Sequence, residues 1–593
     1  MMPDAPGPPV APTPRWVILG SATIVAIALA VQALIPPSAD VAWYLHVAGR
    51  MLGGERLYSD IIEVNPPLVM WLDVPVVWLA NVLRLPAAAV FRSVVGLAGI
   101  GSLLLCGHLL RRSQGPPADP CRRLLLLLLA TILFPMAGHD FGEREHLLLI
   151  LALPYLFLTF LRCDGECVGL PLAVTVGLLA GLGISFKPYF ILLPLGVELG
   201  ARRAGISRTL RAETIAIGVW VLGYMASVSV FTPGYWALLR DLGPLYFQFA
   251  RAPLVATALA SDGAGVALCA ILAAAALRRR ARGNALGLIL LVATISLYVA
   301  GGMQQKGWRY HFYPAAGVGL LLLGMLSKPE GSRGLSVGER VYQAVALAVV
   351  IFVPGLALLS DAARLLRPTG GQSAAEIEYH RMAEMVLREA PGGTLLALSS
   401  DLASAFPLVL ETELSWKAPL PSLWPLQASY QRELASPEPL LYRTPEMQGD
   451  LERWMNGVVY ESLVHTRPDI LLVTRAMPDR VVWGGLRFDY FRYFLHQPAF
   501  TPELARYTYL GEIGQYRIFR RLKATDSVRQ AAPPPQATRA TPPTRIATGV
   551  YLVMPSPVTL LEVGLFLLVG TVLFVKLPHG QSEGSIESSG QSD

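Results

Sequence analysis

The chain has 593 residues, of which 53% are hydrophobic and only 15% charged, and its formal net charge is +7. This composition excludes an ordinary soluble globular protein, because the apolar residues occur in long blocks. The positive charge does not indicate nucleic-acid binding, since the Lys and Arg residues gather in short loops between apolar blocks, as they do in polytopic membrane proteins.

Apolar blocks recur along most of the chain. Residues 1–15 are Pro-rich, and we expect them to be disordered and cytoplasmic. The block that follows is too long for a signal-peptide core and lacks a clean cleavage site, so we interpret it as a retained membrane helix. We predict a polytopic α-helical membrane protein with about 12 transmembrane helices. The blocks are Trp16–Ile35, Ala87–Leu110, Leu124–Ala137, Leu147–Leu161, Gly169–Phe186, Tyr189–Ala201, Thr214–Phe231, Val255–Leu277, Leu286–Gly302, Phe312–Leu326, Val341–Leu359 and Tyr551–Val575.

The first loop, residues 36–68, carries the acidic residues Asp40, Asp60 and Glu63. A short amphipathic helix is predicted over Val41–Leu52, where Gly53 and Gly54 end it. Asp40 has two interpretations: the N-cap of this helix, or a carboxylate held above a cavity, where it acts as a base. The local sequence does not decide between them.

The segment Pro67–Leu83 is apolar but contains Asp73 and Pro75. Counting it as a span would place the basic loop that begins at Arg111 outside the membrane, against the positive-inside rule. We therefore predict an interfacial or re-entrant helix within the first outer loop. This topology places four segments on the outer side. They are the two acidic segments, the loop Thr232–Arg251 and residues 304–311.

The second acidic segment, GHDFGEREH (residues 138–146), lies between two apolar blocks. One interpretation is a solvated loop in which Arg144 pairs with a neighbour. The other is a functional site, because ionisable groups at a membrane boundary are costly unless they are solvated or paired. Its candidate residues are Asp140, Glu143, Glu145 and His146.

Basic residues on the predicted outer side have two interpretations as well. Lys187 follows an apolar block, and Lys306, Arg309 and His311 lie among aromatic residues in QQKGWRYHFYP. They are either snorkelling or topogenic flanks, or partners of an anionic ligand such as a lipid phosphate. Arg92, near the start of its apolar block, is a weaker candidate of the same kind.

Residues 360–523 have the composition of a soluble domain. An amphipathic helix is predicted over Ala375–Ala390, and strands over Thr394–Leu398, Asp469–Thr474 and Tyr516–Arg520. We therefore expect an α/β domain outside the membrane. It is followed by a Pro-rich linker (524–549), a C-terminal transmembrane helix (550–576) and a cytoplasmic tail (577–593).

The sequence indicates no metal site. Cys163 and Cys167 are suitably spaced, but they lack nearby His partners. We expect no cofactor; a divalent metal is compatible with the acidic loops, but nothing in the sequence indicates one.

The first loop resembles that of a known superfamily. An early Asp40 and a short helix ending in Gly-Gly are followed by Leu57-Tyr58-Ser59-Asp60 and by Glu63-Val-Asn-Pro-Pro-Leu68. This pattern resembles the C-type integral-membrane glycosyltransferases (GT-C), including bacterial aminoarabinose transferases and protein O-mannosyltransferases. The resemblance covers residues 16–202 well and is topological up to residue 359, so it implies that residues 16–359 form the catalytic membrane domain.

The resemblance implies roles for individual residues. Asp40 matches the first-loop acid that is catalytic or orients the acceptor, Glu63 the acid before the two prolines, and Asp140 or Glu143 the second-loop acid. There are departures: Val41 follows Asp40 where many members have a second acid, and Asn65 precedes the prolines where others have Lys or His. The implied catalytic residues are Asp40, Asp140 and Glu143, and the implied substrate-binding residues are Glu63, Asp60, Arg92, Glu145, His146, Lys187, Lys306, Arg309 and His311.

The implied reaction is the inverting transfer of a sugar from a polyprenyl-phosphate donor to a hydroxyl of a glycan, lipid or protein acceptor. The enzyme would be a hexosyl- or pentosyltransferase of a cell inner membrane, with both termini cytoplasmic and a periplasmic active site and C-terminal domain. Two other functions remain open: a lipid or glycan transporter or flippase, and a non-catalytic envelope assembly protein. A transferase needs its ionisable groups around one outward cavity, whereas a transporter needs a path that continues to the cytoplasmic face.

Overall fold

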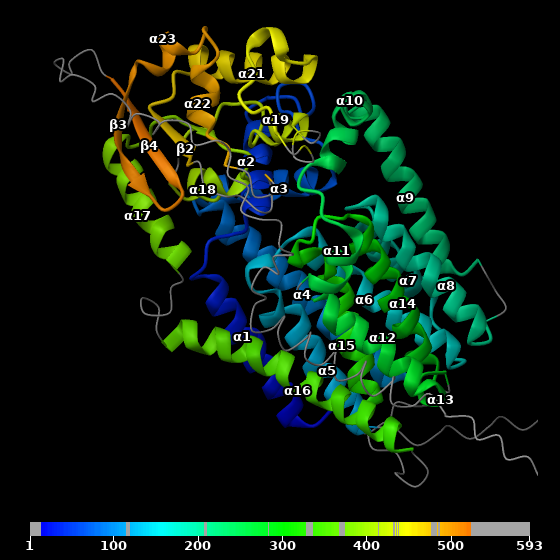
Figure 1. Cartoon of the computed structure of the whole chain (residues 1–593). Helices are drawn as coiled ribbons and strands as arrows, with labels where there is room; N and C mark the ends of the chain where they lie inside the picture. Colours follow the sequence, from blue (N-terminus) through cyan, green and yellow to red (C-terminus); the bar gives the residue numbers. More distant parts are fainter. Residues whose placement is uncertain are drawn as a thin grey trace, which may run out of the picture.

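The computed structural model describes residues 13–522, apart from gaps at 114–118, 207–209, 262, 283, 328–335, 367–373, 413, 431–432, 434–435, 437, 476–482 and 484–486. Figure 1 shows two parts, a body of helices and a smaller domain with a β-sheet at one end of it. The predicted linker 524–549, the helix 550–576 and the tail 577–593 lie outside the described residues, as does most of the segment 1–15.

The helical body follows the apolar blocks of the sequence. Its elements are α1 (Arg15–Gln32), α2 (Ala39–Leu52), α3 (Leu68–Leu83), α4 (Ala87–Arg112), α5 (Asp119–Leu133), η1 (Pro135–Asp140), α6 (Arg144–Cys163), α7 (Leu170–Ile184), η2 (Pro188–Ile191), α8 (Leu192–Arg203), α9 (Ala212–Phe231), α10 (Gly234–Gln248), α11 (Leu254–Ala260), α12 (Ala264–Ala276), α13 (Arg278–Arg282), α14 (Ala285–Met303), η3 (Arg309–Phe312), α15 (Tyr313–Leu326) and α16 (Val337–Leu366).

Among the described residues, seven helices are long and apolar enough to cross a membrane. The helices α3, α7 and α12 are apolar but shorter than 18 residues. The predicted number of about 12 spans therefore stays a prediction. The seven are Arg15–Gln32, Ala87–Arg112, Pro120–Asp140, Arg144–Cys163, Ala212–Phe231, Ala285–Met303 and Val337–Leu366.

Two sequence-based expectations about this body are wrong. The block Val255–Leu277 is two helices, α11 and α12, because the chain turns at Gly263, whose φ of +85° favours glycine. The segment Thr232–Arg251, expected as a loop, contains the 15-residue helix α10.

The short helices of the first loop lie between the helical body and the sheet domain (Figure 1). As predicted, α2 ends at Leu52, followed by Gly53 and by Gly54 with φ +95°. The next helix, α3, packs along α2 and α4. The backbone of this loop also bonds to the sheet domain, since Ile62 N donates to Pro419 O at 2.9 Å. The first loop is thus held from both sides.

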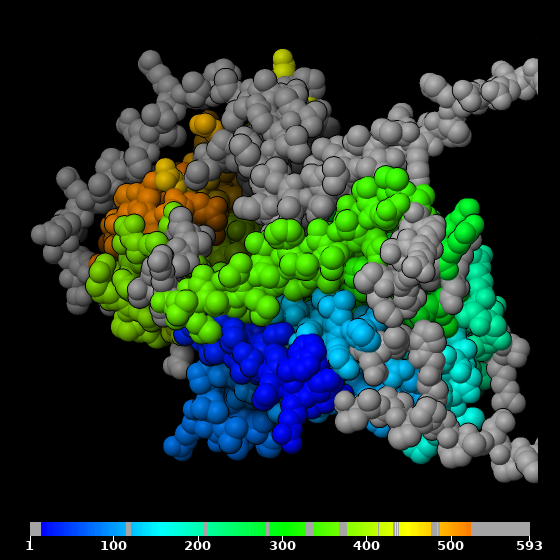
Figure 2. Space-filling model, turned by 90° about the horizontal axis from the view of Figure 1, so that it is seen from below, coloured from blue at the N-terminus to red at the C-terminus, as the bar shows by residue number. Residues whose placement is uncertain are grey.

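The helix α16 connects the two parts. It has 30 residues, and Figure 2 shows it as a light-green band that lies across the blue helix α1 and reaches the sheet domain. α16 packs against α1, α15 and η1.

The sheet domain holds the remaining elements. They are α17 (Ala374–Glu389), β1 (Leu395–Leu398), η4 (Leu402–Ser404), α18 (Leu408–Thr412), α19 (Trp424–Ser429), η5 (Pro445–Met447), α21 (Asp450–Thr466), β2 (Ile470–Thr474), α22 (Tyr490–Leu495), α23 (Thr501–Leu504), β3 (Tyr507–Ile513) and β4 (Tyr516–Arg521).

Its four strands are ordered β1-β2-β4-β3. β1 and β2 are parallel, with Leu395 opposite Ile470, and the hairpin β3–β4 runs antiparallel beside β2. All four residues of β1 are buried, as parallel strands covered on both faces require. The carboxyl ends of β1 and β2 therefore meet at one edge of the sheet, which faces the helical body.

Candidate functional site

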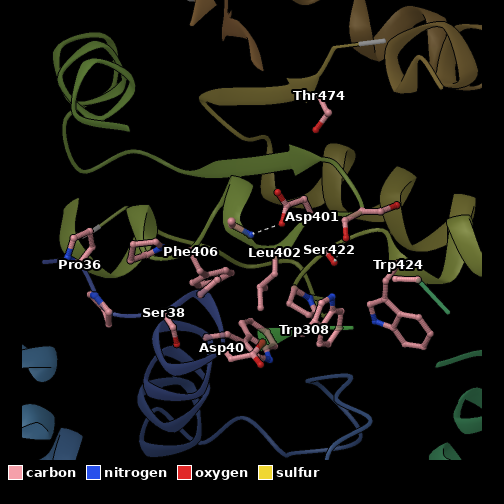
Figure 3. A pocket seen from close by; sticks show the side chains of 18 of the residues that line it. Pro36, Ser38, Asp40, Trp308, Asp401, Leu402, Phe406, Ser422, Trp424 and Thr474 are labelled. Atoms are coloured by element: carbon pink, nitrogen blue, oxygen red, sulfur yellow. Dashed lines mark hydrogen bonds between the residues drawn. The ribbon is translucent and has the colours of Figure 1, made fainter. Parts of the chain in front are cut away.

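A cavity of about 1750 Å³ lies between the helical body and the sheet domain. One side, here called the helical wall, comes from the first loop and the start of α2, from residues 139–143, from the end of α10 and from residues 307–310. The other side, the sheet wall, comes from α17 and from the loops at the sheet edge. Figure 3 shows Ser38, Asp40 and Trp308 on the helical side, with Asp401, Ser422 and Thr474 across from them.

Asp40 lies in the first turn of α2 and lines the cavity. It is not the N-cap, because Ser38 holds that position and its Oγ accepts from Val41 N at 3.3 Å. The cap interpretation of Asp40 is therefore wrong. Its Oδ2 lies 3.4 Å from Arg144 Nη2 and accepts from the Tyr310 hydroxyl at 3.4 Å. Among the described residues, Oδ1 has no hydrogen-bond partner, so one carboxylate oxygen is held and the other remains available.

Arg144 connects the two acidic segments. It is the first residue of α6, yet its side chain is only 2% exposed. Its guanidinium donates to Asn65 Oδ1 as well as to Asp40, and it lies over the Tyr44 ring, 5.2 Å from the ring centroid. These contacts with a carboxylate, an amide and an aromatic face fix the first loop against the second.

Glycines shape the second acidic segment. Gly138 has φ +50° and Gly142 has φ +88°, both in the left-handed region. A Cβ on Gly142 would lie 2.3 Å from a ring carbon of Phe91, so no other residue fits there. These turns bring Glu143 to the N-cap of α6, where its Oε1 accepts from the Ser38 hydroxyl. Burial and the nearby Asp40 raise the pKa of Glu143 well above its ordinary value.

Glu63 lines the cavity beside Asp40 but is fully engaged on both oxygens. Trp43 Nε1 donates to its Oε2 at 2.6 Å, and Asn65 donates to its Oε1 from the backbone at 2.8 Å and from the side chain at 2.7 Å. Burial raises the pKa of this carboxyl, against the opposing effect of these hydrogen bonds. Glu63 thus positions Asn65, which in turn accepts from Arg144.

Lys187 and Glu145 form a buried pair behind the helical wall. Lys187 Nζ donates to Glu145 Oε1 at 2.6 Å and to Gln304 Oε1 at 2.9 Å, and it lies 5.2 Å from the centroid of the Tyr310 ring. Burial lowers the pKa of Lys187, against the effect of Glu145. Neither Lys187 nor Glu145 lines the cavity.

Arg309 is the basic residue of the helical wall that faces open space. Its Nη2 lies 3.0 Å from Asp140 Oδ2, and its side chain is 53% exposed while that of Asp140 is 15% exposed. Both residues line the cavity. The pair therefore presents a guanidinium with unused donors to whatever enters.

Neither Lys306 nor His311 lines the cavity. Lys306 Nζ donates to the backbone carbonyls of Tyr246 and Phe249, and burial next to Arg251 lowers its pKa to about 7. His311 is 3% exposed and packs on Trp308 and Tyr310, whose ring centroids lie 5.3 Å and 4.6 Å away. Lys306 thus fixes the end of α10, and His311 supports two rings that line the cavity.

Three further predicted residues lie outside the cavity. Asp60 pairs with Arg56 at 3.1 Å on an exposed turn. Arg92 donates to the carbonyl of Ile35. His146 is buried, where its Nδ1 accepts from Gly142 N at 2.9 Å and its Nε2 lies 2.9 Å from Leu133 O. These contacts fix the local backbone.

Several residues of the site and its support could not be predicted from the sequence. Arg144 stood within the acidic segment, but its charge alone did not reveal a buried pairing with Asp40. The sheet wall gave no signal, because its polar residues are scattered over loops that meet only in the folded domain. Its lining side chains include Glu376, Glu378, Ser400, Asp401, Ser422, Thr474, Arg475, Tyr490, Gln515 and Tyr516.

No three His, Cys, Asp or Glu side chains in the described part of the chain converge so as to hold a metal ion. The acidic groups of the helical wall instead engage guanidinium, hydroxyl, indole and amide donors. The expectation of no metal or cofactor stays a prediction from the sequence.

No family model and no curated protein sequence matches the chain. Its fold is similar to two crystal structures of ArnT from Cupriavidus metallidurans, each 14% identical. The structure bound to undecaprenyl phosphate has a TM-score of 0.50 over 86% of this chain and 98% of ArnT. The apo structure has a TM-score of 0.48 over 85% and 97%. The arabinofuranosyltransferase AftD from Mycobacteria is 15% identical, with a TM-score of 0.40 over 86% of this chain and 40% of AftD.

At this identity the likeness to ArnT bears on the fold alone. It extends over almost the whole of ArnT and most of this chain. The fold expected from the first loop is therefore confirmed as one that ArnT shares. With seven long apolar helices among the described residues, the chain is an integral membrane protein.

Proposed function

We propose that the chain is a membrane glycosyltransferase that moves a sugar from a polyprenyl-phosphate donor to an acceptor hydroxyl, with inversion at the anomeric carbon. The observation that carries the proposal is Asp40: its carboxylate lies on a large cavity, with Oδ2 held by Arg144 and Tyr310 and Oδ1 without a partner among the described residues. A general base needs this combination of fixed orientation and an accessible oxygen.

In the proposed reaction Asp40 takes the proton of the acceptor hydroxyl. The acceptor oxygen forms its bond to the anomeric carbon as the bond from that carbon to the phosphate oxygen breaks. The electron pair leaves with the polyprenyl phosphate, and attack from the face opposite the leaving group inverts the anomeric centre. Arg144 and Tyr310 keep the carboxylate in place throughout, as positioning residues.

The leaving phosphate needs a cation, and Arg309 is best placed to supply it. Arg309 lines the cavity with half of its side chain exposed, whereas Lys187 and Lys306 direct their amines to internal acceptors. Fixed donors that meet developing negative charge lower the barrier of such a step. We therefore assign the phosphate to Arg309 and the two lysines to the support of the wall.

Three observations support the donor class and the location. ArnT, whose fold this chain shares, was crystallised with undecaprenyl phosphate. Asp40, Asp140 and Arg309 line one cavity at one end of the helical body, as a transferase requires and a transport path does not. The basic loops of the sequence support an outer position for this end by the positive-inside rule, and we propose that the membrane is a cell inner membrane.

The first experiment compares envelope lipids and glycans by mass spectrometry. The strains are a deletion strain and the same strain complemented with wild type, Asp40→Asn or Asp60→Asn at matched membrane levels. Asp60 is the matched control, because it belongs to the same loop but pairs with Arg56 on an exposed turn. We expect one envelope species to lack a sugar-sized mass in the deletion and Asp40→Asn strains, and to be restored by wild type and Asp60→Asn.

Full restoration by Asp40→Asn would remove the base from the mechanism. No missing species in the deletion strain would overturn the transferase function and favour a transporter or an assembly protein.

A further inference from the structure

The sheet wall contains a polar site at the carboxyl ends of β1 and β2. Ser400 and Asp401 follow β1, and Thr474 and Arg475 stand at the end of β2. Because the two strands are parallel neighbours, their ends meet at the same sheet edge. Open α/β sheets bind ligands at this edge, since the loops there converge on one place.

The loop after β1 is held in a fixed conformation. The Tyr490 hydroxyl accepts from Ser400 N at 3.0 Å and donates to Ser400 Oγ at 2.7 Å. Trp483 Nε1 donates to the Tyr490 hydroxyl at 2.9 Å. Trp483 stacks on Phe488 with ring centroids 4.0 Å apart. Fixed side chains around an opening reduce the entropy cost of binding.

Among the described residues, Thr474 places a hydroxyl that makes no internal hydrogen bond at the same sheet edge, and its residue lines the cavity. Its Oγ1 atom is buried and makes no hydrogen bond in the described part of the structure. Buried hydroxyls are rarely left without a partner, because burial removes their hydration. Figure 3 shows this side chain above Asp401, across the cavity from Asp40.

Arg475 adds a directed donor set to the same edge. It is held by Glu512 Oε2 at 3.0 Å and by the Gly514 carbonyl at 3.2 Å, yet its side chain is 40% exposed. The sheet wall also carries the carboxylates Glu376, Glu378 and Asp401. Because acids outnumber bases there, the wall does not suit a densely phosphorylated ligand.

The cavity has room for two ligands. Sites for one small molecule measure roughly 300–1,000 Å³, and this cavity measures about 1750 Å³. A donor sugar next to Asp40 and Arg309 would occupy the helical side only. The sheet side, with its aromatic rings and separate hydrogen-bonding groups, is left for the second substrate.

We propose that the sheet edge at Asp401, Thr474 and Arg475 is a binding site for a saccharide acceptor. A sugar ring combines apolar C–H faces with hydroxyl edges, which match aromatic rings interleaved with a carboxylate, a guanidinium and a hydroxyl. The site deepens the proposed function and rests on it for the role of acceptor. Saccharide binding as such depends only on the wall.

The test measures binding and transfer separately. The probe is the pool of saccharides released by mild acid from the envelope of the deletion strain, which holds the unmodified acceptor. Binding to the purified full chain in detergent is followed by saturation-transfer difference NMR. Two further probes, a pool of short peptides and dispersed phospholipid, are run in the same way.

The variants are Thr474→Val and Arg475→Gln, with Arg506→Gln as the matched control. Arg506 pairs with Glu503 at 3.1 Å and is 51% exposed, so it resembles Arg475 in setting but lies outside the cavity. Thr474→Val keeps the shape of the side chain and removes only the hydroxyl. Unchanged thermal midpoints establish that each variant is folded.

We expect saccharide signals with wild type and with Arg506→Gln, and at least a threefold loss with Thr474→Val and with Arg475→Gln. Equal signals in all variants, or signals from the peptide or lipid probe instead, would overturn the acceptor site. Such a result leaves the transferase proposal standing if the Asp40→Asn strain still lacks its envelope species. If that strain lacks nothing while saccharides still bind at the wall, the transferase proposal fails and the saccharide site stands.

Discussion

The helical wall and the sheet wall hold their charged side chains in different ways. In and behind the helical wall, the side chains of Arg144, Glu145 and Lys187 are each less than a tenth exposed. Lys187 pairs with Glu145, and Arg144 pairs with Asp40. On the sheet wall, Arg475 and its partner Glu512 are 40% and 30% exposed. Both walls therefore carry ion pairs, but the buried ones lie in and behind the helical wall, where the pair of Arg309 and Asp140 is the exposed exception.

This difference in burial predicts which ion pairs contribute to folding stability and which contribute mainly to binding. Removing one partner of a buried pair leaves the other charge without water or counter-ion. In an exposed pair, water takes the place of the missing partner. We infer that the helical wall is fixed before substrate arrives, as positioning of a base requires. The sheet wall tolerates substitution, and its residues affect binding more than folding.

The largest effect on stability is expected at Lys187. Lys187→Met leaves Glu145, which is 0% exposed, without its cation, and should cost about 3–5 kcal/mol of unfolding free energy. The double variant Lys187→Met/Glu145→Met removes both charges and should recover at least about 1 kcal/mol of that loss. Chemical denaturation of the purified protein measures both values. A double variant that is no more stable than the single variant would show that the pair is not the cause.

A smaller but still large loss is expected at Arg144. Arg144→Met removes charge-assisted bonds to Asp40 and Asn65, each of which contributes about 1.5–3 kcal/mol in comparable settings. The loss is limited because Asp40 is 24% exposed and regains water. Transfer should fall as well, since Asp40 loses its orientation. A stable Arg144→Met protein with full transfer would show that Arg144 neither stabilises the fold nor orients Asp40 for catalysis.

The sequence predicted the helical side of the molecule better than the sheet side. Apolar blocks set most helices, and Gly53 and Gly54 set the end of α2, because these signals are local. Strand β3 was missed, since a bulge between Tyr509 and Gly511 breaks its alternation. The acids Asp40 and Glu143, which were expected to share a site, line the same cavity.

Partners distant in the sequence account for what could not be predicted. Arg144 meets Asp40 across 104 residues, a pairing that depends on how two loops pack. Lys306 and Arg309 looked alike in one basic-aromatic segment, yet one bonds to the end of α10 and the other faces the cavity. The direction of a side chain on a loop is set by its tertiary neighbours, and three residues of separation suffice to reverse it.

A pH-dependent effect is expected at Glu143. Because its pKa is raised, the folded protein keeps this proton where the unfolded chain has lost it. Its contribution to stability is full below the ordinary glutamate value of 4.5 and is lost as pH rises through the folded value. Glu143→Gln stays neutral, so wild type should lose stability relative to it as pH rises above 4.5. Thermal midpoints of both proteins between acid and neutral pH test this, and parallel curves would contradict it.

The smallest effect on stability is expected at Arg309, the exposed exception of the helical wall. Arg309→Gln should change the unfolding free energy by less than about 1 kcal/mol, because its pair with Asp140 is open to water. Transfer should nevertheless fall at least about tenfold, since the leaving phosphate loses its cation. Arg240→Gln is the control, an exposed arginine paired with Asp241 at 2.9 Å outside the cavity. If Arg309→Gln transfers sugar as well as Arg240→Gln does, the phosphate is not bound at Arg309. The exposure of a basic side chain would then no longer tell which cation contacts the substrate and which only supports the wall.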